Sequence, residues 1–415
     1  MRKFRHKSKA ARIEAKILLM LAFFSVSAGL WENFRQLWLQ DNGFSASEVS
    51  AITSLGLFIS VGGVILVGAK LKLRYLKPFM TLLLGFKLVA LVILLGLDGS
   101  TQSGLIKLCT IADILTTYLM VASVYPLITT LNKSNRIYSK RKLVEYWFRD
   151  IGVLVGGIVL GQSFFGKLVD YNVCLMIAAI FLSFAIMTMF SFQLKPHVQE
   201  DKHAASIVKY VLKSRLQVCY MLYAFLAATS FAAALGLKML VLTNYLNFSA
   251  NTATDYLLIV GLLSDVVGVL ALKYFTPKND YLTMTLKFGV RLVSYVIVVF
   301  ANNPFISLLA ITWSILISTA YEDVSDGHYI NLVDNRHQLS YSTLKHVMSF
   351  LGEAVGTLIC GVTYNFGVPT MIGTAAIITA VQLGLCYYLI FLRTRHRRVR
   401  HSASRMRYNE RITEI

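Results

Sequence analysis

Four side chains that can carry or exchange protons lie close together in the segment AYEDVSDGHY. Glu322 and Asp326 are four residues apart and Asp323 precedes Asp326 by three, so a helix brings the three carboxylates together. Carboxylates this close cannot all ionise at low cost, and at least one is expected to hold a proton near neutral pH. His328 adds a group that titrates in the physiological range. The pattern favours a proton-coupling site. The alternative is a helix end that opens into water and merely solvates the acids.

Four further ionisable residues lie within apolar segments. Glu32 and Arg35, in WENFRQLW, are three residues apart, so a helix would let them pair on one face. Asp113, in LCTIADILTTY, has no partner in its own turn. It either carries a proton, because burial disfavours the ionised form, or pairs with a cation such as Lys238. We expect these residues to bind solute or couple protons. For Glu32 and Arg35 the alternative is an ion pair at the membrane boundary.

A third group is suited to gating. Glu145 stands four residues before Arg149, the favoured orientation for a helical ion pair, and Asp150 follows directly. Because this group begins at the boundary of an apolar segment, it favours a gate or an interdomain pair over solute binding. Asp265 and Glu353 are lone acids in two other apolar segments. They are suited to pairing between the two halves of the chain.

The elements that must position these residues are membrane-spanning helices. The 415-residue chain is 56% hydrophobic and 15% charged, with a mean hydropathy of +0.61, which an ordinary soluble protein of this size does not reach. A spanning helix needs about 20 mostly apolar residues. The sequence therefore predicts an all-α polytopic membrane protein of about twelve spans. The predicted spans are 17–38, 48–69, 79–98, 105–130, 143–165, 172–194, 217–243, 255–275, 282–302, 304–331, 340–365 and 370–392.

Basic residues predict the orientation, because Lys and Arg concentrate in cytoplasmic loops. Alternate loops hold nearly all of the loop Lys and Arg, and the loops on the other side hold only Lys167. We therefore expect an integral plasma-membrane protein with both termini in the cytoplasm. Its predicted parts are a basic N-terminus (1–16), an N-terminal six-helix bundle (17–194), a cytoplasmic linker (195–216), a C-terminal six-helix bundle (217–392) and a basic tail (393–415).

An internal repeat supports the division into halves. Asn135-Arg136 recurs as Asn335-Arg336, and Lys87 falls opposite Arg291 after a four-residue shift. Several matches in the same order at nearly one offset indicate duplication. Glycines four residues apart let helices in lipid pack closely, and packing is the role we expect for them. The repeated glycines are Gly152, Gly156 and Gly161 in the first half and Gly352, Gly356 and Gly361 in the second.

The sequence lacks the motifs expected of nucleic-acid-binding proteins, metalloproteins and enzymes. The formal charge of +20 lies between apolar runs and at the chain ends, which fits topology and anionic lipid headgroups rather than nucleic acid. The five cysteines lie in apolar stretches with no Cys-x-x-Cys, so we expect core packing and no metal. The chain has no phosphate-binding loop and no HExxH or GxSxG motif. We therefore expect neither a cofactor nor an enzyme.

Twelve spans, a central cytoplasmic loop, duplicated halves and glycine-rich fifth and eleventh helices resemble the major facilitator superfamily over nearly the whole chain. In that family the loop after the second helix reads Gly-x-x-x-Asp-Arg-x-Gly-Arg-Arg. Here GAKLKLRYLK keeps Gly68 and the basic character, but Lys72 stands where the acid would be. The resemblance implies two six-helix bundles, with helices one, four, seven and ten lining a central cavity. It also implies that Lys87 and Arg291 lie toward lipid, snorkelling or forming interdomain pairs.

These observations favour a secondary transporter. Two bundles would rock about a midplane site and move a small polar or amphiphilic solute by symport or antiport, with protons as the coupling ion. The expected partners are the solute, membrane lipids and protons, with the protein as a monomer. The alternatives are a lipid or glycolipid flippase or a drug exporter on the same scaffold. An integral-membrane lipid enzyme and a non-transporting receptor or assembly factor are further alternatives.

Overall fold

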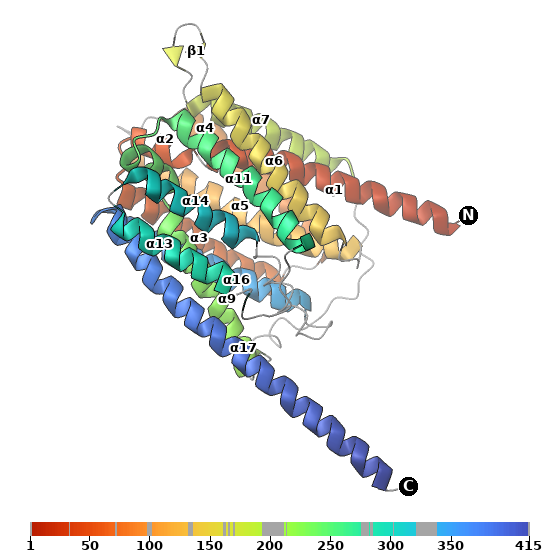
Figure 1. The fold of residues 1–415 in the computed structure, drawn as a ribbon. Helices are drawn as coiled ribbons and strands as arrows, with labels where there is room; N and C mark the ends of the chain where they lie inside the picture. Colours follow the sequence, from red (N-terminus) through yellow and green to blue (C-terminus); the bar gives the residue numbers. More distant parts are fainter. Residues whose placement is uncertain are drawn as a thin grey trace.

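Figure 1 shows a bundle of long helices, from which the N-terminal part of α1 and the C-terminal part of α17 extend away. The computed structural model describes residues 2–32, 34–70, 73–97, 102–131, 136–160, 163–164, 167–168, 171–192, 211–212, 214–274, 282, 285–301, 303–320 and 338–413. The first half contains α1 (Arg2–Glu32), α2 (Arg35–Asp41), α3 (Ala46–Lys70), α4 (Leu73–Leu95), α5 (Ser103–Leu131), α6 (Arg136–Leu160), β1 (Ser163–Phe164), β2 (Lys167–Leu168) and α7 (Tyr171–Phe190). The second half contains α9 (Arg215–Leu235), α10 (Lys238–Leu240), the π-helix η1 (Val241–Tyr245), α11 (Ala250–Tyr274), the π-helix η2 (Thr285–Gly289), α13 (Val290–Phe300), α14 (Pro304–Ala320), α16 (Gln338–Tyr364) and α17 (Val368–Thr413).

Each predicted span overlaps at least one described helix. Within the described residues, 8 helices are long and apolar enough to cross a membrane, with mean hydropathies between 1.4 and 2.5. A shorter apolar helix covers Pro304–Ile317. The two-residue strands β1 and β2 form a small antiparallel hairpin between α6 and α7. The predicted all-α polytopic membrane fold is confirmed.

Helix contacts repeat between the two halves. In the first half α1 packs against α6 and α7, and in the second half α9 packs against α16 and α17. The pairs α4–α5, α3–α5 and α4–α7 recur as α13–α14, α11–α14 and α13–α17. Between the halves, α3 packs against α16 and α6 packs against α11. The contacts therefore describe two pseudo-symmetric bundles joined along two equivalent seams.

Two of the predicted spans are interrupted. The predicted span over 17–38 lies within an apolar stretch, Arg12–Asp41, that is long enough to cross a membrane, in which α1 ends at Glu32 and α2 begins at Arg35. In the second half α9 ends at Leu235 and is followed by the short α10 and by η1. The interruptions occupy equivalent places in the two halves. They matter for the site because a turn redirects the side chains that follow it.

Gln36 joins the two interruptions. Its Nε2 donates to the carbonyl oxygen of Gly236 at 2.7 Å, and its Oε1 accepts from the backbone N–H of Met239 at 3.3 Å. Helix ends leave backbone groups without intrahelical partners, and such groups are costly to bury unsatisfied. A buried side chain of the first half therefore hydrogen-bonds two backbone groups at the helix interruption of the second half.

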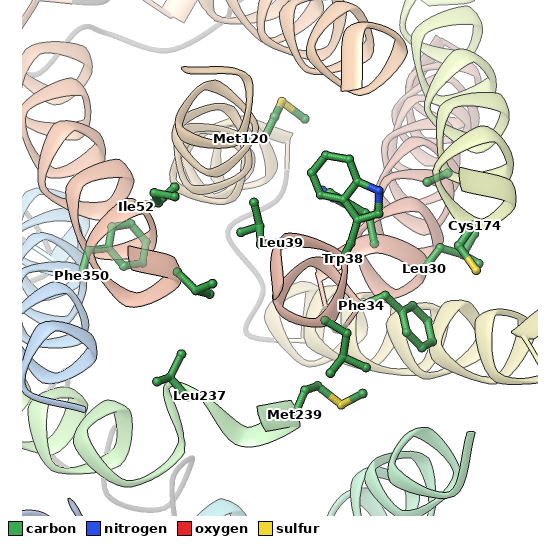
Figure 2. Packing of buried hydrophobic residues seen from close by; sticks show 14 of the residues in the cluster. Leu30, Phe34, Trp38, Leu39, Ile52, Met120, Cys174, Leu237, Met239 and Phe350 are labelled. Atoms are coloured by element: carbon green, nitrogen blue, oxygen red, sulfur yellow. The ribbon is translucent and has the colours of Figure 1, made fainter. Parts of the chain in front are cut away.

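Apolar residues of both halves surround this junction. Figure 2 shows Trp38 and Leu39 of α2 together with Leu237 and Met239 of the second half, and all four belong to one buried cluster. Trp31 and Trp38 meet edge to face across the turn, with ring centroids 5.6 Å apart. The core therefore continues from one half into the other at the α2–α10 end of the bundle.

Repeated glycines lie where helices approach closely. A Cβ on Gly152 of α6 would overlap the carbonyl oxygen of Val26 in α1, and a Cβ on Gly352 of α16 would overlap that of Phe225 in α9. These two contacts join equivalent helix pairs. At the other repeat positions, a Cβ on Gly156 would meet the ring of Phe34, on Gly356 the backbone of Thr229, and on Gly361 the side chain of Ser50. Gly161 lies outside the described residues.

Gly152→Ala should destabilise the protein by about 1–3 kcal/mol, because the added methyl group forces α6 away from α1. Gly85 of α4 is the matched control, since a Cβ there would have nothing within 4 Å. Gly85→Ala should leave the melting temperature unchanged or raise it, because Ala favours a helix by about 1 kcal/mol over Gly. Thermal unfolding in detergent measures both variants, and equal effects would contradict the packing role.

Candidate functional site

Asp113 stands at the centre of a buried charge cluster in the first half. Its Oδ2 accepts from Arg35 Nη1 at 3.1 Å and from Trp31 Nε1 at 3.2 Å, and its Oδ1 pairs with the ammonium of Lys87. Lys87 also donates to Thr117 Oγ1 at 2.6 Å. Asp113 is 0% exposed and Lys87 is 1% exposed. Helices α1, α2, α4 and α5 are therefore tied together by one carboxylate.

This cluster corrects three expectations. Arg35 does not pair with Glu32, because Arg35 binds Asp113 and Glu32 binds Arg149. Asp113 is paired, as one of its two alternatives foresaw, but with Arg35 and Lys87 rather than Lys238. Lys87 is buried inside the first half and does not snorkel toward lipid.

Arg291, the counterpart of Lys87 in the second half, is also buried rather than turned to lipid. It is 5% exposed, and its Nη1 donates to Ser230 Oγ at 3.2 Å. Its guanidinium lies over the rings of Phe231 and Phe288, each 5.5 Å from the ring centroid. Aromatic faces attract a cation, which helps to offset its removal from water. Each half thus buries a basic side chain at the repeated position.

Glu32 forms its ion pair with Arg149, which joins α1 to α6. The side chains are 14% and 44% exposed, so this pair is less enclosed than the Asp113 cluster. Asp150 lies against the second half, where its Oδ1 would be 3.1 Å from a Cβ on Gly261 of α11. The segment that the sequence favoured as a gate therefore reaches both α1 and α11. Glu145 lies one turn before Arg149 on α6 and is half-buried.

Glu353 and Tyr118 form a direct hydrogen bond between the halves. The phenol of Tyr118, on α5, donates to Glu353 Oε1 on α16 at 2.5 Å. The ring of Tyr118 also meets Phe350 of α16 edge to face, with centroids 4.8 Å apart. Both Tyr118 and Glu353 are half-buried and lie near the middle of their helices. The lone acid on α16 therefore faces the first half.

Lys238 enters the same region from α10. It lies within electrostatic reach of Arg149, Glu32, Asp150 and Glu353. Among the residues that the structure describes, no hydrogen bond or ion pair reaches its ammonium group. Lys238 is half-buried. A cation so placed, with carboxylates near but not in contact, can take up a polar group of a ligand.

The hydrogen bonds between the halves lie toward the α2–α10 end or at the middle of the bundle. Besides the Gln36 bonds, Ser50 Oγ donates to the Thr357 carbonyl at 2.6 Å and Ser54 Oγ donates to the Ala354 carbonyl at 2.8 Å. Both serines lie in the first third of α3, next to α2. These bonds therefore fasten the halves at the α2–α10 end and at the middle of the bundle.

The predicted site residues thus fall into two groups. The structure gathers Glu32, Arg149, Asp150, Lys238 and Glu353 at the centre, with the Arg35–Asp113 pair beside them. Asp265 lies on α11, and its side chain is outside the description. The acidic cluster Glu322, Asp323 and Asp326 with His328 lies outside the described residues, so its role stays a prediction.

Sequence reasoning missed Trp31, Gln36, Thr117 and Tyr118. Each is an uncharged residue in an apolar helix, where its type does not distinguish a site residue from a core residue. A weak signal existed for two of them, because Thr117 is four residues after Asp113 and Trp31 is four residues before Arg35. Neighbours at such spacing share a helix face or a turn with a charged group that must be satisfied.

Comparisons with solved structures agree with this architecture. No family model matches the chain, and no curated protein matches its sequence. The nucleoside transporter NupG is similar in structure, with a TM-score of 0.72 at 9% identity, covering 91% of this chain and 99% of that one. A bacterial homolog of the human lysosomal transporter Spinster gives 0.69 at 10% identity, covering 92% and 97%. The fucose:proton symporter FucP of E. coli gives 0.64 at 14% identity, covering 92% and 99%. The chain therefore has the fold of the major facilitator superfamily transporters.

Proposed function

We propose that this protein is a secondary active transporter that moves a small polar or amphiphilic solute across the membrane by alternating access, with protons as the coupling ion. One observation carries the proposal. Ionisable side chains from α1, α5 and α6 of the first half meet those from α10 and α16 of the second half at the middle of the bundle. An ionisable group at bilayer depth is costly, and such residues usually mark a substrate or ion pathway.

The charges in this region favour a solute with polar or opposite charges. The basic and acidic members are equal in number, so the region has no formal excess of either sign when all are ionised. A dipolar or zwitterionic solute can exchange contacts with both signs without leaving a buried charge uncompensated. The basic members are Arg35, Lys87, Arg149 and Lys238, and the acidic members are Glu32, Asp113, Asp150 and Glu353.

The fastening at the α2–α10 end supports the alternating-access part of the proposal. Bonds from Gln36, Ser50 and Ser54 hold the halves together at the α2–α10 end. If the N-terminus is cytoplasmic, as the loop charges predict, that end faces outward, so these bonds close the outward side. Transporters of the same fold include a fucose:proton symporter, which supports protons as the coupling ion.

The test is transport by the purified protein. Metabolites, peptides, drugs and lipids are screened for a rise in melting temperature at two pH values, and labelled hits are offered to proteoliposomes. Uptake should accelerate when the outer solution is acidified and should collapse with a protonophore, while protein-free liposomes show neither effect. Translocation of a labelled lipid without uptake of any soluble hit would instead indicate a flippase. Absence of both would refute the proposal.

A further inference from the structure

Glu353 differs from Asp113 and Glu32 in what it contacts. Asp113 is held by two cations and Glu32 by one, whereas the direct partner of Glu353 is the neutral phenol of Tyr118. Within the described residues, no Lys or Arg forms an ion pair with Glu353. A proton that binds Glu353 therefore displaces no cation. At Asp113 the same event would leave Arg35 and Lys87 buried without a counter-charge.

We propose that Glu353 is the residue whose protonation couples the proton to the conformational change, and that its bond with Tyr118 is a latch between the halves which protonation weakens. The inference rests on the proposed function, to which it adds the coupling residue and the bond that residue controls. It places coupling on Glu353 and Tyr118 rather than on Asp113 or the acidic cluster at 322–326.

The groups that face Glu353 come from several helices. Tyr118 of α5 is in contact, and Arg149 of α6, Glu32 of α1 and Arg35 of α2 act on it electrostatically. Lys238 of α10 is also within electrostatic reach. Three of these groups are cations and Glu32 is an anion. On α16 itself, His346 lies two turns earlier, with its ring 6.0 Å from that of Phe350.

Protonation changes the latch in a definite direction. A hydrogen bond to an ionised carboxylate is roughly twice as strong as one between neutral groups, so the ionised form of Glu353 holds Tyr118 more tightly. The protonated form should raise the ratio of parted to closed halves roughly five- to tenfold. Acid should therefore part the α2–α10 end, and alkali should close it.

The test measures the α2–α10 end directly and needs no solute. Spin labels are placed on Gln40→Cys of α2 and Thr370→Cys of α17, two exposed positions in different halves. The five native cysteines are buried or half-buried, and a sample without the added pair measures their background labelling. The distance distribution is recorded in lipid nanodiscs between pH 8 and pH 5. Unsubstituted Glu353 should show a longer-distance population that grows as the pH falls.

Glu353→Gln keeps an oxygen that accepts from Tyr118 but cannot titrate, so it should show the long population at every pH. Tyr118→Phe leaves Glu353 titratable but removes the latch, so it should raise the long population at pH 8 and reduce the pH response. It also keeps the proposal testable if Glu353→Gln does not fold. Glu48→Gln, a carboxylate paired with Lys107 near the same end, is the matched control and should behave like the parent.

A parent protein without a pH response, or Glu353→Gln with the parent's response, would overturn the proposal. So would loss of the response in Asp326→Asn together with its survival in Glu353→Gln, because that result would assign coupling to the acidic cluster. The two proposals fail separately. A pH-dependent distance without solute uptake refutes the transport function alone, and uptake with a pH-independent distance refutes the latch alone.

Discussion

Asp113→Asn should destabilise the fold by about 3–5 kcal/mol, the loss expected when one partner of a buried ion pair is removed. The amide keeps the shape of the carboxylate, but Arg35 and Lys87 then share a buried site without a negative charge. Unfolding by SDS in mixed micelles measures the loss. Four of the five cysteines are buried, so a thiol-reactive dye reports the transition.

Two matched variants separate charge from packing. Lys87→Met leaves Asp113 with Arg35 and Trp31, one cation for one carboxylate, and should cost less than Asp113→Asn. The double variant should be more stable than the sum of the two losses predicts, because it buries one uncompensated charge rather than two. Asp255→Asn, at an exposed carboxylate on α11, should change nothing. An additive double variant would contradict the role given to Asp113.

Hydropathy was sufficient to predict where the helices lie, because lipid requires each spanning segment to be apolar over about 20 residues. The repeated glycines also predicted a real physical feature. Gly152 and Gly352 mark close approaches in equivalent helix pairs, since a side chain at either position would meet the neighbouring backbone. Segment hydropathy and glycine spacing are both properties of residues close together in the chain, so they can be read from a single sequence.

The ion pairs were predicted less well, because their partners are far apart in the chain. Glu32 pairs with Arg149, which is 117 residues away, and Arg35 bonds Asp113, which is 78 residues away. The local Glu32–Arg35 pair assumed a continuous helix. Spacing within one segment cannot show that a distant side chain competes for the same charge.

Helix-face assignments by resemblance also misplaced side chains. The third and ninth helices were expected to present Lys87 and Arg291 to lipid, yet both side chains point into their own halves. The physical reason is that each finds a partner there: a carboxylate for Lys87, and a hydroxyl with two aromatic rings for Arg291. A specific buried partner therefore determines the side-chain orientation more strongly than the helix position typical of the family does.

Lys238→Met should reduce solute uptake roughly a hundredfold while leaving the protein folded. Truncating a charged group that contacts a buried partner typically costs 2–5 kcal/mol of binding, and each 1.4 kcal/mol is tenfold. The side chain is a plausible ligand contact on physical grounds, since in the described part of the chain its ammonium has no hydrogen bond or ion pair, although Glu32, Asp150 and Glu353 are near. Methionine keeps an apolar side chain of similar length. Removing a cation that no described residue holds directly should therefore spare stability.

The measurement is the initial rate of uptake into proteoliposomes at several concentrations of the best hit from the thermal-shift screen. A rise in KM with little change in maximal rate would indicate lost contact with the solute, whereas a lower maximal rate at unchanged KM would indicate a slower conformational step. Lys107→Met is the control. Lys107 forms an ion pair with Glu48, with Nζ and Oε1 3.2 Å apart, and this pair is separate from the central charges. Uptake by Lys238→Met equal to that by Lys107→Met would exclude Lys238 from the solute site. The central charges would then have to bind solute through Arg149, whose pair with Glu32 would open for each passage.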